Sequence, residues 1–363
     1  MTATVASPAA PAAEAQPAGT LARWWKAVAG GNYVVMIIAG YIVSLALFSL
    51  LVALKGAGPF SIYHTMVSST LLNGHAVQQT IIRAIPIALA ALAVAIPARA
   101  GLINVGGEGQ LILGAVAATG IGVAIGDHVP GAVSWIAMCL GGALAGAAWA
   151  SIAGVLRTWL GASEAVTTLL LNFIANDIML YLIYQSWKDP QGSGQPQSRP
   201  LPDNAQLPSL FGLQVTWALV IAAVAAVAVW FLLTKTGWGF ALRVVGGNNE
   251  AARRSGLRVK SLLLSSMAVG GALSGLGGAL NLAGVETQLR PDITATFGYV
   301  AFLASFLGRH SPLKVVLAAL LFSAIALSGN GLQITDGLDG AIVDVLLALI
   351  VAVPLVMAKY RRR

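Results

Sequence analysis

Long apolar runs, separated by short polar segments, follow one another along almost the whole chain. As an α-helix, such a run needs about 20 residues to cross about 30 Å of hydrocarbon, and helices satisfy their own backbone hydrogen bonds in lipid. Ten runs can be recognised: Tyr33–Leu54, Ile81–Pro97, Gln110–Ile125, Val133–Val155, Ala165–Gln185, Val215–Leu233, Leu262–Ala283, Ile293–Leu307, Val315–Leu327 and Ala341–Met357. The pattern predicts an all-α, polytopic membrane protein with eight to ten transmembrane helices. Eight is expected if the short runs 293–307 and 315–327 form a re-entrant pair.

Composition indicates lipid rather than water as the main solvent. Hydrophobic residues make up 57% of the chain and charged residues 9%, whereas a soluble domain carries about 25% charged residues. Cys139 is the only cysteine, which excludes an internal disulfide framework. Residues 1–30 are rich in alanine and proline and are expected to be a disordered cytoplasmic tail. Residues 31–358 are expected to form a single transmembrane domain, and 359–363 a short basic cytoplasmic tail.

The basic residues predict which side of the membrane each loop faces. With a cytoplasmic N-terminus and alternating runs, sixteen of the 21 Lys and Arg residues fall inside. The five that fall outside are Lys55, Arg83, Lys188, Arg199 and Arg290. The positive-inside rule therefore predicts that both termini and loop 234–261 are cytoplasmic and that loop 187–214 is extracytoplasmic. The net charge of +8 is therefore explained by the cytoplasmic loops, whose basic residues lie next to anionic lipid headgroups. No nucleic-acid partner is expected.

Small residues four positions apart occur in two of the runs. The pairs are Gly142/Gly146, Gly271/Gly275 and Ser274/Gly278. The hydrophobic effect contributes little to the association of helices in lipid, so helices depend on close packing. Small residues permit this because they let the two backbones approach closely. These positions are therefore expected to pack helices together, with a role as moving surfaces during transport as the alternative.

A glycine-rich stretch, GLINVGGEGQLILGA (101–115), interrupts the apolar pattern between the second and third runs. Irregular backbone at membrane depth is tolerated where protein or a water-filled cavity satisfies it. We interpret the stretch as a kinked hinge at the inner mouth of a pathway, braced by the Glu108 carboxylate. The alternative is an ordinary tight turn with an exposed carboxylate. As a hinge, it predicts that Gly107→Val impairs transport more than Gly142→Ala. The candidate hinge residues are Asn104, Gly106, Gly107, Glu108, Gly109 and Gln110.

Polar residues of the fifth run are the candidates for contact with a solute. Thr168, Asn172 and Asn176 recur at a spacing of four and so share one helix face. Amides and hydroxyls can bind a small polar solute without a fixed charge. The alternative is hydrogen bonding between helices, worth about 0.6 kcal/mol for each bond. The adjacent Asp177 is costly in lipid and is expected to face the interior of the bundle.

Loop 234–261 contains the signals of a short helix. Asn248 or Asn249 can cap it, Glu250 lies in its first turn, and Gly256 suits the left-handed position after its end. Isolated helices this short are marginal in water, so we expect it to lie against a surface. It is either a docking helix that receives a push from a cytoplasmic motor or a solvated basic loop.

Several motifs resemble the permeases of ATP-binding-cassette (ABC) importers. Residues 250–256 match the E-A-A-x-x-x-G core of the loop that engages the ATPase, although the further I-x-L-P part is absent. Within the branched-chain amino acid/simple-sugar group, GLINVGGEGQLILGA resembles F-N-I-G-x-E-G-Q. GASEAVTTLLLNFIA (161–175) resembles N-E-V-I-T-T-x-x-L-N-Y-I-A, with Ser163 and Phe173 as departures. PQSRPLP (196–202) and FGYVAFLASFLGRHSPL (297–313) also fit, so the likeness covers most of residues 80–355.

The resemblance implies a permease subunit of an ABC importer in a bacterial cytoplasmic membrane. It is greatest to the larger permease of nucleoside (guanosine-type) importers, with simple sugars as the alternative solute. It implies ATPase subunits that carry ATP and Mg²⁺, a second permease that is a paralogue, and an extracytoplasmic solute-binding lipoprotein. The residues implied in ATPase coupling are Gly246, Asn248, Glu250, Ala251, Ala252, Arg253 and Gly256.

The chain contains no nucleotide-binding motif of its own. None of its seven lysines follows a glycine, so no G-x-x-x-x-G-K-[ST] loop is present. We therefore expect no cofactor on this chain and no enzymatic activity. An ion-coupled secondary transporter is the less favoured alternative, because the runs offer few buried ionisable residues beyond Asp177 and Glu108.

Overall fold

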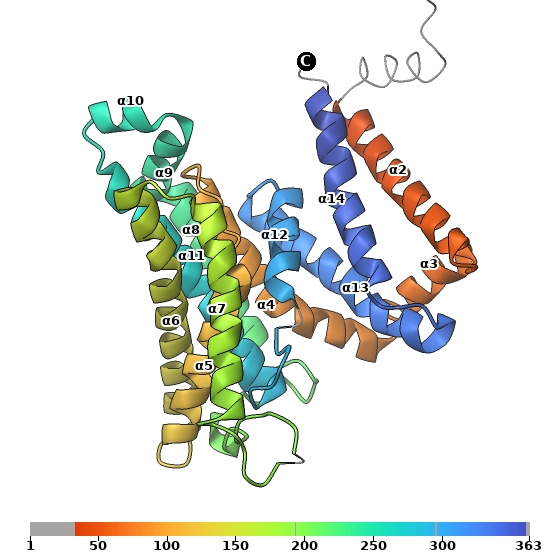
Figure 1. The fold of residues 1–363 in the computed structure, drawn as a ribbon, viewed down its shortest axis with the longest axis horizontal. Helices are drawn as coiled ribbons and strands as arrows, with labels where there is room; N and C mark the ends of the chain where they lie inside the picture. Colours follow the sequence, from red (N-terminus) through yellow and green to blue (C-terminus); the bar gives the residue numbers. More distant parts are fainter. Residues whose placement is uncertain (1–32, 193, 295, 361–363) are drawn as a thin grey trace, which may run out of the picture.

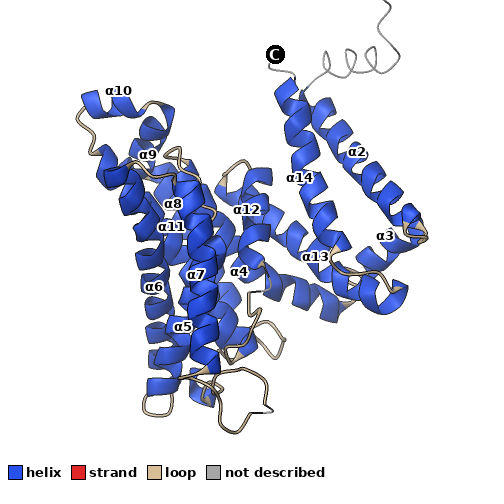
Figure 2. Ribbon diagram, in the orientation of Figure 1, coloured by secondary structure: helices blue, strands red, loops and turns tan. Residues whose placement is uncertain are grey.

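Helices account for most of the computed structural model, which describes residues 33–192, 194–294 and 296–360 (Figures 1 and 2). The α-helices are α2 (Tyr33–Leu54), α3 (Pro59–Ser68), α4 (Gly74–Ala98), α5 (Gly107–Ile125), α6 (Gly131–Leu160), α7 (Glu164–Tyr184), α8 (Ala218–Lys235), α9 (Gly237–Gly247), α10 (Asn249–Arg254), α11 (Val259–Asn281), α12 (Phe297–Leu307), α13 (Pro312–Asp336) and α14 (Ile342–Tyr360). A 3-10 turn, η1 (Asp203–Ala205), and a π-helical turn, η2 (Leu282–Glu286), complete the helical elements of these residues. The all-α prediction is confirmed for the described residues, where β-structure amounts to two isolated bridges.

Eight of these helices are long and apolar enough to cross a membrane: α2, α4, α5, α6, α7, α8, α11 and α13. The apolar helices Phe297–Leu307 and Ile342–Met357 are shorter. The run 315–327, which we expected to be short, belongs to the 25-residue helix α13, because the helix continues through the polar residues 328–336. The helix ends at Gly337, whose positive φ of 63° is a left-handed stop. The runs 293–307 and 315–327 therefore do not form two short helices, because α12 has 11 residues and α13 has 25.

The helix ends separate into two groups on the molecule. The start of α2, the end of α14 and the pair α9 and α10 lie at one end of the structure (Figure 1). The loop between α7 and α8 lies at the opposite end, as does the connection between α5 and α6 (Figure 1). The beginning and the end of the described membrane domain therefore share a side with the segment 234–261, as an even number of crossings requires.

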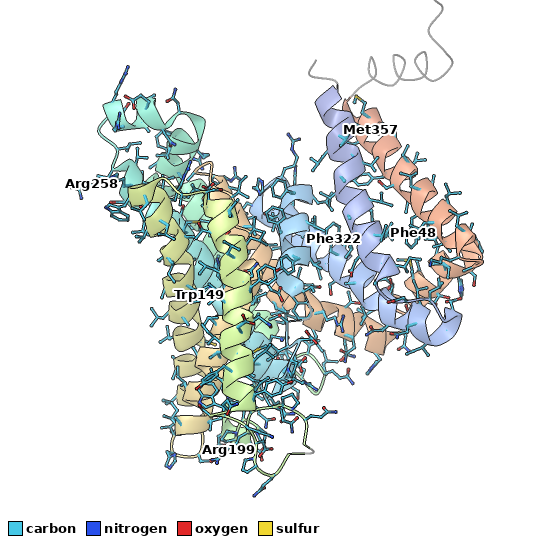
Figure 3. The ribbon with its side chains drawn as sticks, in the orientation of Figure 1. Phe48, Trp149, Arg199, Arg258, Phe322 and Met357 are labelled. Carbon is cyan, nitrogen blue, oxygen red and sulfur yellow. The ribbon has the colours of Figure 1, made fainter. Side chains whose placement is uncertain are left out.

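Helix α4 is the most enclosed in the bundle, followed by α5 and α11. Residues 84–97 of α4 are almost all buried, and α11 packs against α4, α5 and α6. The outer helices leave large apolar side chains exposed, for example Leu144 (69% exposed) on α6 and Val224 (64%) on α8. Figure 3 shows side chains projecting outward along the outer helices of the bundle. Such surfaces are suited to lipid or to another membrane subunit rather than to water.

Glycines bring α5, α6 and α11 into backbone contact. A Cβ added at Gly146 would lie 2.2 Å from the Gly271 carbonyl oxygen, and one added at Gly275 would lie 2.2 Å from the Gly142 oxygen. A Cβ at Gly278 would lie 1.9 Å from the Leu111 oxygen. The packing role predicted for these small residues is confirmed, since any side chain would push the helices apart.

The structure leaves different room for a methyl group at Gly107 and at Gly142, and the effect of Gly107→Val on transport stays a prediction. A Cβ at Gly142 would lie 2.7 Å from the Cβ of Ala279, whereas one at Gly107 would be in ordinary contact, 3.6 Å from the Gly298 Cα. We now expect Gly142→Ala to destabilise the protein by about 1–3 kcal/mol through overpacking and Gly107→Ala to have little effect. Thermal unfolding of the purified variants measures the difference, and equal midpoints would contradict the packing seen here.

Candidate functional site

The turn between α4 and α5 is built around two buried amides. Asn104 and Gln110 are 0% and 1% exposed. Asn104 Oδ1 accepts hydrogen bonds from Gly106 N (2.9 Å) and from Gln110 Nε2 (3.0 Å), and Asn104 Nδ2 donates to Gln110 Oε1 (3.2 Å). This reciprocal pair satisfies polar groups that would be costly to bury alone and fixes the glycine-rich turn at the start of α5.

Side chains of α7 hold the same turn from the other side. Thr168 Oγ1 accepts from Val105 N (3.1 Å) and donates to Glu164 O (2.7 Å). Asn172 Oδ1 accepts from Gly109 N (2.9 Å), and its Nδ2 donates to Val105 O (3.0 Å). Both residues are buried. Their hydrogen-bonding groups are thus directed to the backbone of residues 105–109. This agrees with the alternative given above for these polar residues, which is hydrogen bonding between helices rather than contact with a solute.

The remaining two candidates on α7 lie outside this network. Asn176 is half-buried, and its side chain makes no hydrogen bond within the described residues. Asp177 is exposed, so our expectation that its carboxylate faces the interior of the bundle is wrong for the isolated chain. The reason is the placement of α7 at an edge of the bundle, where a step of about 100° per residue turns position 177 away from the face that carries Asn172.

Glu108 joins the turn to α12. Its carboxylate is 7% exposed; Oε2 accepts from Gly298 N (2.6 Å) and Oε1 from the Thr294 hydroxyl. Gly298 lies in the first turn of α12, so the carboxylate satisfies a free amide at a helix N-terminus and opposes the positive end of the helix dipole. The alternative of an exposed carboxylate is wrong.

Four further residues complete this network, and none of them was predicted to belong to it. Glu164 Oε1 accepts from Ile103 N (3.1 Å), while its Oε2 pairs with Arg157 Nε (3.3 Å). Ser274 donates to Gly107 O (2.7 Å) from α11. Thr294 and Gly298 are the partners of Glu108. Only Glu164 could have been recognised from the sequence, because an acidic residue is favoured in the first turn of a helix.

The short helix predicted in 248–256 is confirmed as α10. Asn248 Oδ1 accepts from Glu250 N (2.9 Å) and Ala251 N (3.0 Å), and Gly256 has a φ of +83°. Glu250 forms ion pairs with the arginines three and four residues later, at 2.6 and 3.2 Å. Ala252 is fully buried against the neighbouring elements. The helix therefore presents charged side chains to the outside and anchors itself through a small apolar residue.

The end of α9 connects α10 to the glycine-rich turn. A Cβ added at Gly246 would lie 2.2 Å from the Arg99 carbonyl oxygen, whereas one at Gly247 would meet no atom within 4 Å. Gly101, with a φ of +79°, faces Gly246 at the same point. The predicted coupling segment and the predicted hinge are thus in direct backbone contact.

A cationic group lies beside this contact. Arg99 Nη2 donates to the His310 carbonyl oxygen (2.8 Å). Burial lowers the pKa of Arg99, and the nearby Arg243 lowers it further. Burial, and then the charge of Arg99, also lower the pKa of His310, which favours its neutral imidazole. The turn is therefore held next to arginines at the end of the molecule that carries α10.

Asn172→Ala is expected to destabilise the protein because it leaves two backbone groups, Gly109 N and Val105 O, without partners. Each unsatisfied buried group costs about 1–3 kcal/mol. Asn176→Ala, one helical turn away, is the matched control and should unfold close to the wild-type temperature. If both variants unfold at the wild-type temperature, Asn172 does not hold the turn.

Together, the fold and the network define a polytopic helical membrane protein in which the turn between α4 and α5 is hydrogen-bonded to α7, α11 and α12 and contacts the end of α9. Residues 76–355 match the family model of the branched-chain amino acid transport system permease component. The chain is 34% identical over 346 residues to a glucose ABC transporter permease of Haloferax volcanii, covering 92% of this chain and 88% of the relative. It is 29% identical over 352 residues to a guanosine ABC transporter permease of Bacillus subtilis, with 92% and 98% covered. A nucleoside ABC transporter permease of Lactococcus lactis subsp. cremoris is 29% identical over 305 residues, with 82% and 83% covered.

The chain therefore belongs to this permease family. It is the membrane-spanning permease subunit of an ABC transporter, and hence a transport component rather than an enzyme. Membership implies, in general terms, an ATPase and a solute-binding protein as partners.

Proposed function

We propose that this permease forms the translocation path of a nucleoside importer. Support comes from the guanosine and nucleoside permeases, to which the chain is similar over 92% and 82% of its own length. The glucose permease, at 34% identity, makes a sugar the second candidate. The solute is in either case small, polar and uncharged.

We further propose that the ATPase docks on α10 and that ATP and Mg²⁺ are bound by that partner alone. The residues proposed to couple movement of the ATPase to the permease are Gly246, Asn248, Glu250, Ala251, Ala252, Arg253 and Gly256. The contact of Gly246 with Arg99 supports this role, because it would carry a displacement of α10 into the turn at 103–110. The same turn is bonded to α7 and α12, so it is suited to act as the hinge.

The pathway is proposed to run along α7. Thr168 and Asn172 position the hinge, whereas Asn176 and Asp177 lie on the side of α7 that the isolated chain leaves open. A second permease, a paralogue of this one, would cover that side. A carboxylate at Asp177 then lies in a wet path between subunits and not in lipid.

The orientation follows from the charges. The segment 234–261, which includes α10, contains six of the 21 lysine and arginine residues, so we place this end of the molecule in the cytoplasm of a bacterial cell, with both termini inside. The α7–α8 loop then faces the extracytoplasmic solute-binding lipoprotein.

Uptake by the complete transporter in proteoliposomes tests the solute assignment. ATP-dependent accumulation of labelled guanosine, competed by uridine and not by glucose, is the expected result. Accumulation of glucose with no guanosine uptake would instead establish the sugar alternative, and uptake driven by an ion gradient without ATP would contradict both.

A further inference from the structure

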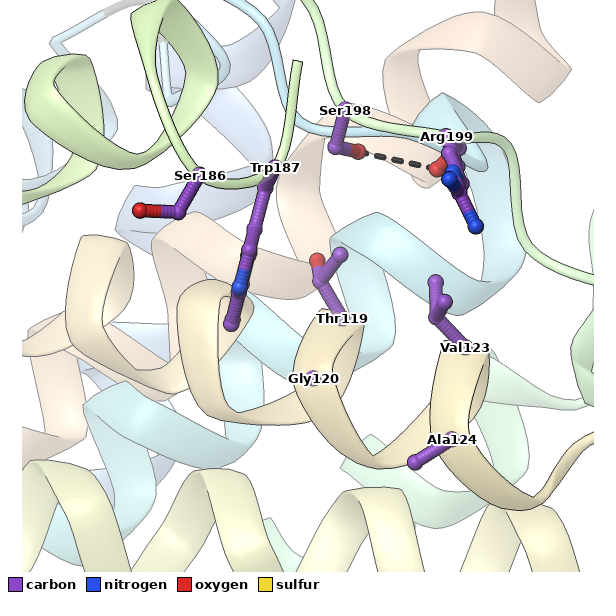
Figure 4. A pocket seen from close by; sticks show the side chains of 8 residues that line it. All are labelled: Thr119, Gly120, Val123, Ala124, Ser186, Trp187, Ser198 and Arg199. Carbon is purple, nitrogen blue, oxygen red and sulfur yellow. Dashed lines mark hydrogen bonds between the residues drawn. The ribbon is translucent and has the colours of Figure 1, made fainter. Parts of the chain in front are cut away.

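A cavity of about 290 Å³ lies at the end of the molecule opposite α10. It opens between the second half of α5 and two parts of the α7–α8 loop (Figure 4). Trp187 forms one wall with its ring seen edge-on, Thr119 lies at the base, and Arg199 lies on the far side (Figure 4). Small-molecule sites measure about 300–1,000 Å³, so this cavity suits one ring-sized group rather than a peptide.

The walls of this cavity are held in place by specific contacts. A Cβ added at Gly120 of α5 would lie 3.0 Å from the Trp187 ring, so the indole rests directly on the helix. The loop beside it is pinned to the segment after α11: Ser198 N donates to Leu289 O (2.9 Å), and Ser198 Oγ accepts from Leu289 N (2.9 Å). A pre-formed site loses less conformational entropy when a ligand binds.

The polar groups around the cavity have capacity left for a ligand. Arg199 is exposed and makes no ion pair with any described residue, and the Ser186 hydroxyl is likewise without a hydrogen bond among them. Thr119 Oγ1 donates to Ala115 O (2.9 Å), which leaves its lone pairs as acceptors. Arg199 therefore lies across the cavity from the indole, with Thr119 and Ser198 between them, whereas Ser186 lies on the other side of the Trp187 ring (Figure 4).

We propose that this cavity is an extracytoplasmic docking site for the base of the incoming nucleoside. The indole offers a flat face on which a base stacks, and such stacking is worth about 1–3 kcal/mol for each base. The Arg199 fork donates to carbonyl and ring-nitrogen acceptors on the edge of the base. The ribose is left to the hydroxyls of Thr119 and Ser198, which lie between the ring and Arg199 (Figure 4). This proposal rests on the proposed function for the nucleoside class and for the outward orientation of the loop.

Binding to the purified permease–ATPase complex, without the solute-binding protein, tests this site. Guanosine is titrated up to about 1 mM, and uridine and glucose up to about 10 mM, while indole fluorescence is recorded with correction for absorption by the ligand. A saturable quench with the nucleosides, absent with glucose, is expected. It should disappear in Trp187→Phe and persist in Trp217→Phe, which changes another exposed tryptophan. Arg199→Gln should raise the apparent Kd about tenfold, the loss expected for one charge-assisted hydrogen bond, whereas Lys188→Gln should leave it unchanged.

No saturable quench with nucleosides, or a quench that survives in Trp187→Phe, would overturn the site. A quench by glucose alone would overturn the assignment to a base. These outcomes are separate from the uptake assay: guanosine uptake without binding at this cavity rejects the site and leaves the proposed function standing. Wild-type proteoliposomes that fail to take up guanosine reject the proposed function itself.

Discussion

Replacing Gly298 with alanine is expected to abolish transport and to lower the melting temperature of the purified protein. A Cβ at this position would lie 2.1 Å from Glu108 N and 2.5 Å from its Cα, against backbone that cannot rotate away. The first turn of α12 would have to move, which would break the bond from Gly298 N to the Glu108 carboxylate (2.6 Å). Overpacking alone costs about 1–3 kcal/mol, and a buried amide and carboxylate left without partners add to it.

Gly107→Ala is the matched control for this prediction. Gly107 lies across the same contact, but its added Cβ would be 3.6 Å from the Gly298 Cα, an ordinary distance. We expect this variant to unfold and to transport like the wild-type protein. If Gly298→Ala were equally well tolerated, the close junction between α5 and α12 would not exist in the working protein.

Gly246→Ala is expected to uncouple ATP hydrolysis from transport. The added Cβ would lie 2.2 Å from the Arg99 carbonyl oxygen and would separate the end of α9 from the turn at 99–106. In the complete transporter we therefore expect the ATPase rate to stay within about twofold of wild type while solute uptake falls by at least tenfold. Both rates are measured on the same proteoliposomes.

The neighbouring glycine provides the control for this contact. Gly247→Ala adds the same methyl group at the end of the same helix, where no atom lies within 4 Å. Uptake should be close to wild type in this variant. Equal loss of uptake in both variants would indicate a general effect on α9, and full uptake in Gly246→Ala would remove the proposed route from α10 to the hinge.

Features that depend on nearby residues could be predicted from the sequence. The apolar runs predicted the long helices, and α10 was predicted with its cap because Asn248, Glu250 and Gly256 act within two turns of each other. The close packing of α6 on α11 was also expected, since small residues four apart share a helix face. The start of α4 at Gly74, seven residues before the apolar run, was missed because its first two turns are polar.

Features that depend on which helices meet could not be predicted. Nothing near Glu108 in the sequence indicates that its partners are Thr294 and Gly298, 186 and 190 residues away. The burial of Asn172 and the exposure of Asp177 depend on the position of α7 at the edge of the bundle. A carboxylate on an apolar helix is costly in lipid, but that cost does not determine whether the chain itself or a second subunit encloses it.

Thiol labelling of α10 tests the central claim that this helix is the cytoplasmic contact for the ATPase. Cys139 is the only native cysteine, so Arg254→Cys in a Cys139→Ala background carries a single thiol, at a position where the native side chain is 79% exposed. We expect a membrane-impermeant maleimide to label this position in inverted membrane vesicles and the ATPase subunit to protect it. Intact cells or spheroplasts should stay unlabelled. Labelling in intact cells or spheroplasts would place α10 outside and contradict the account.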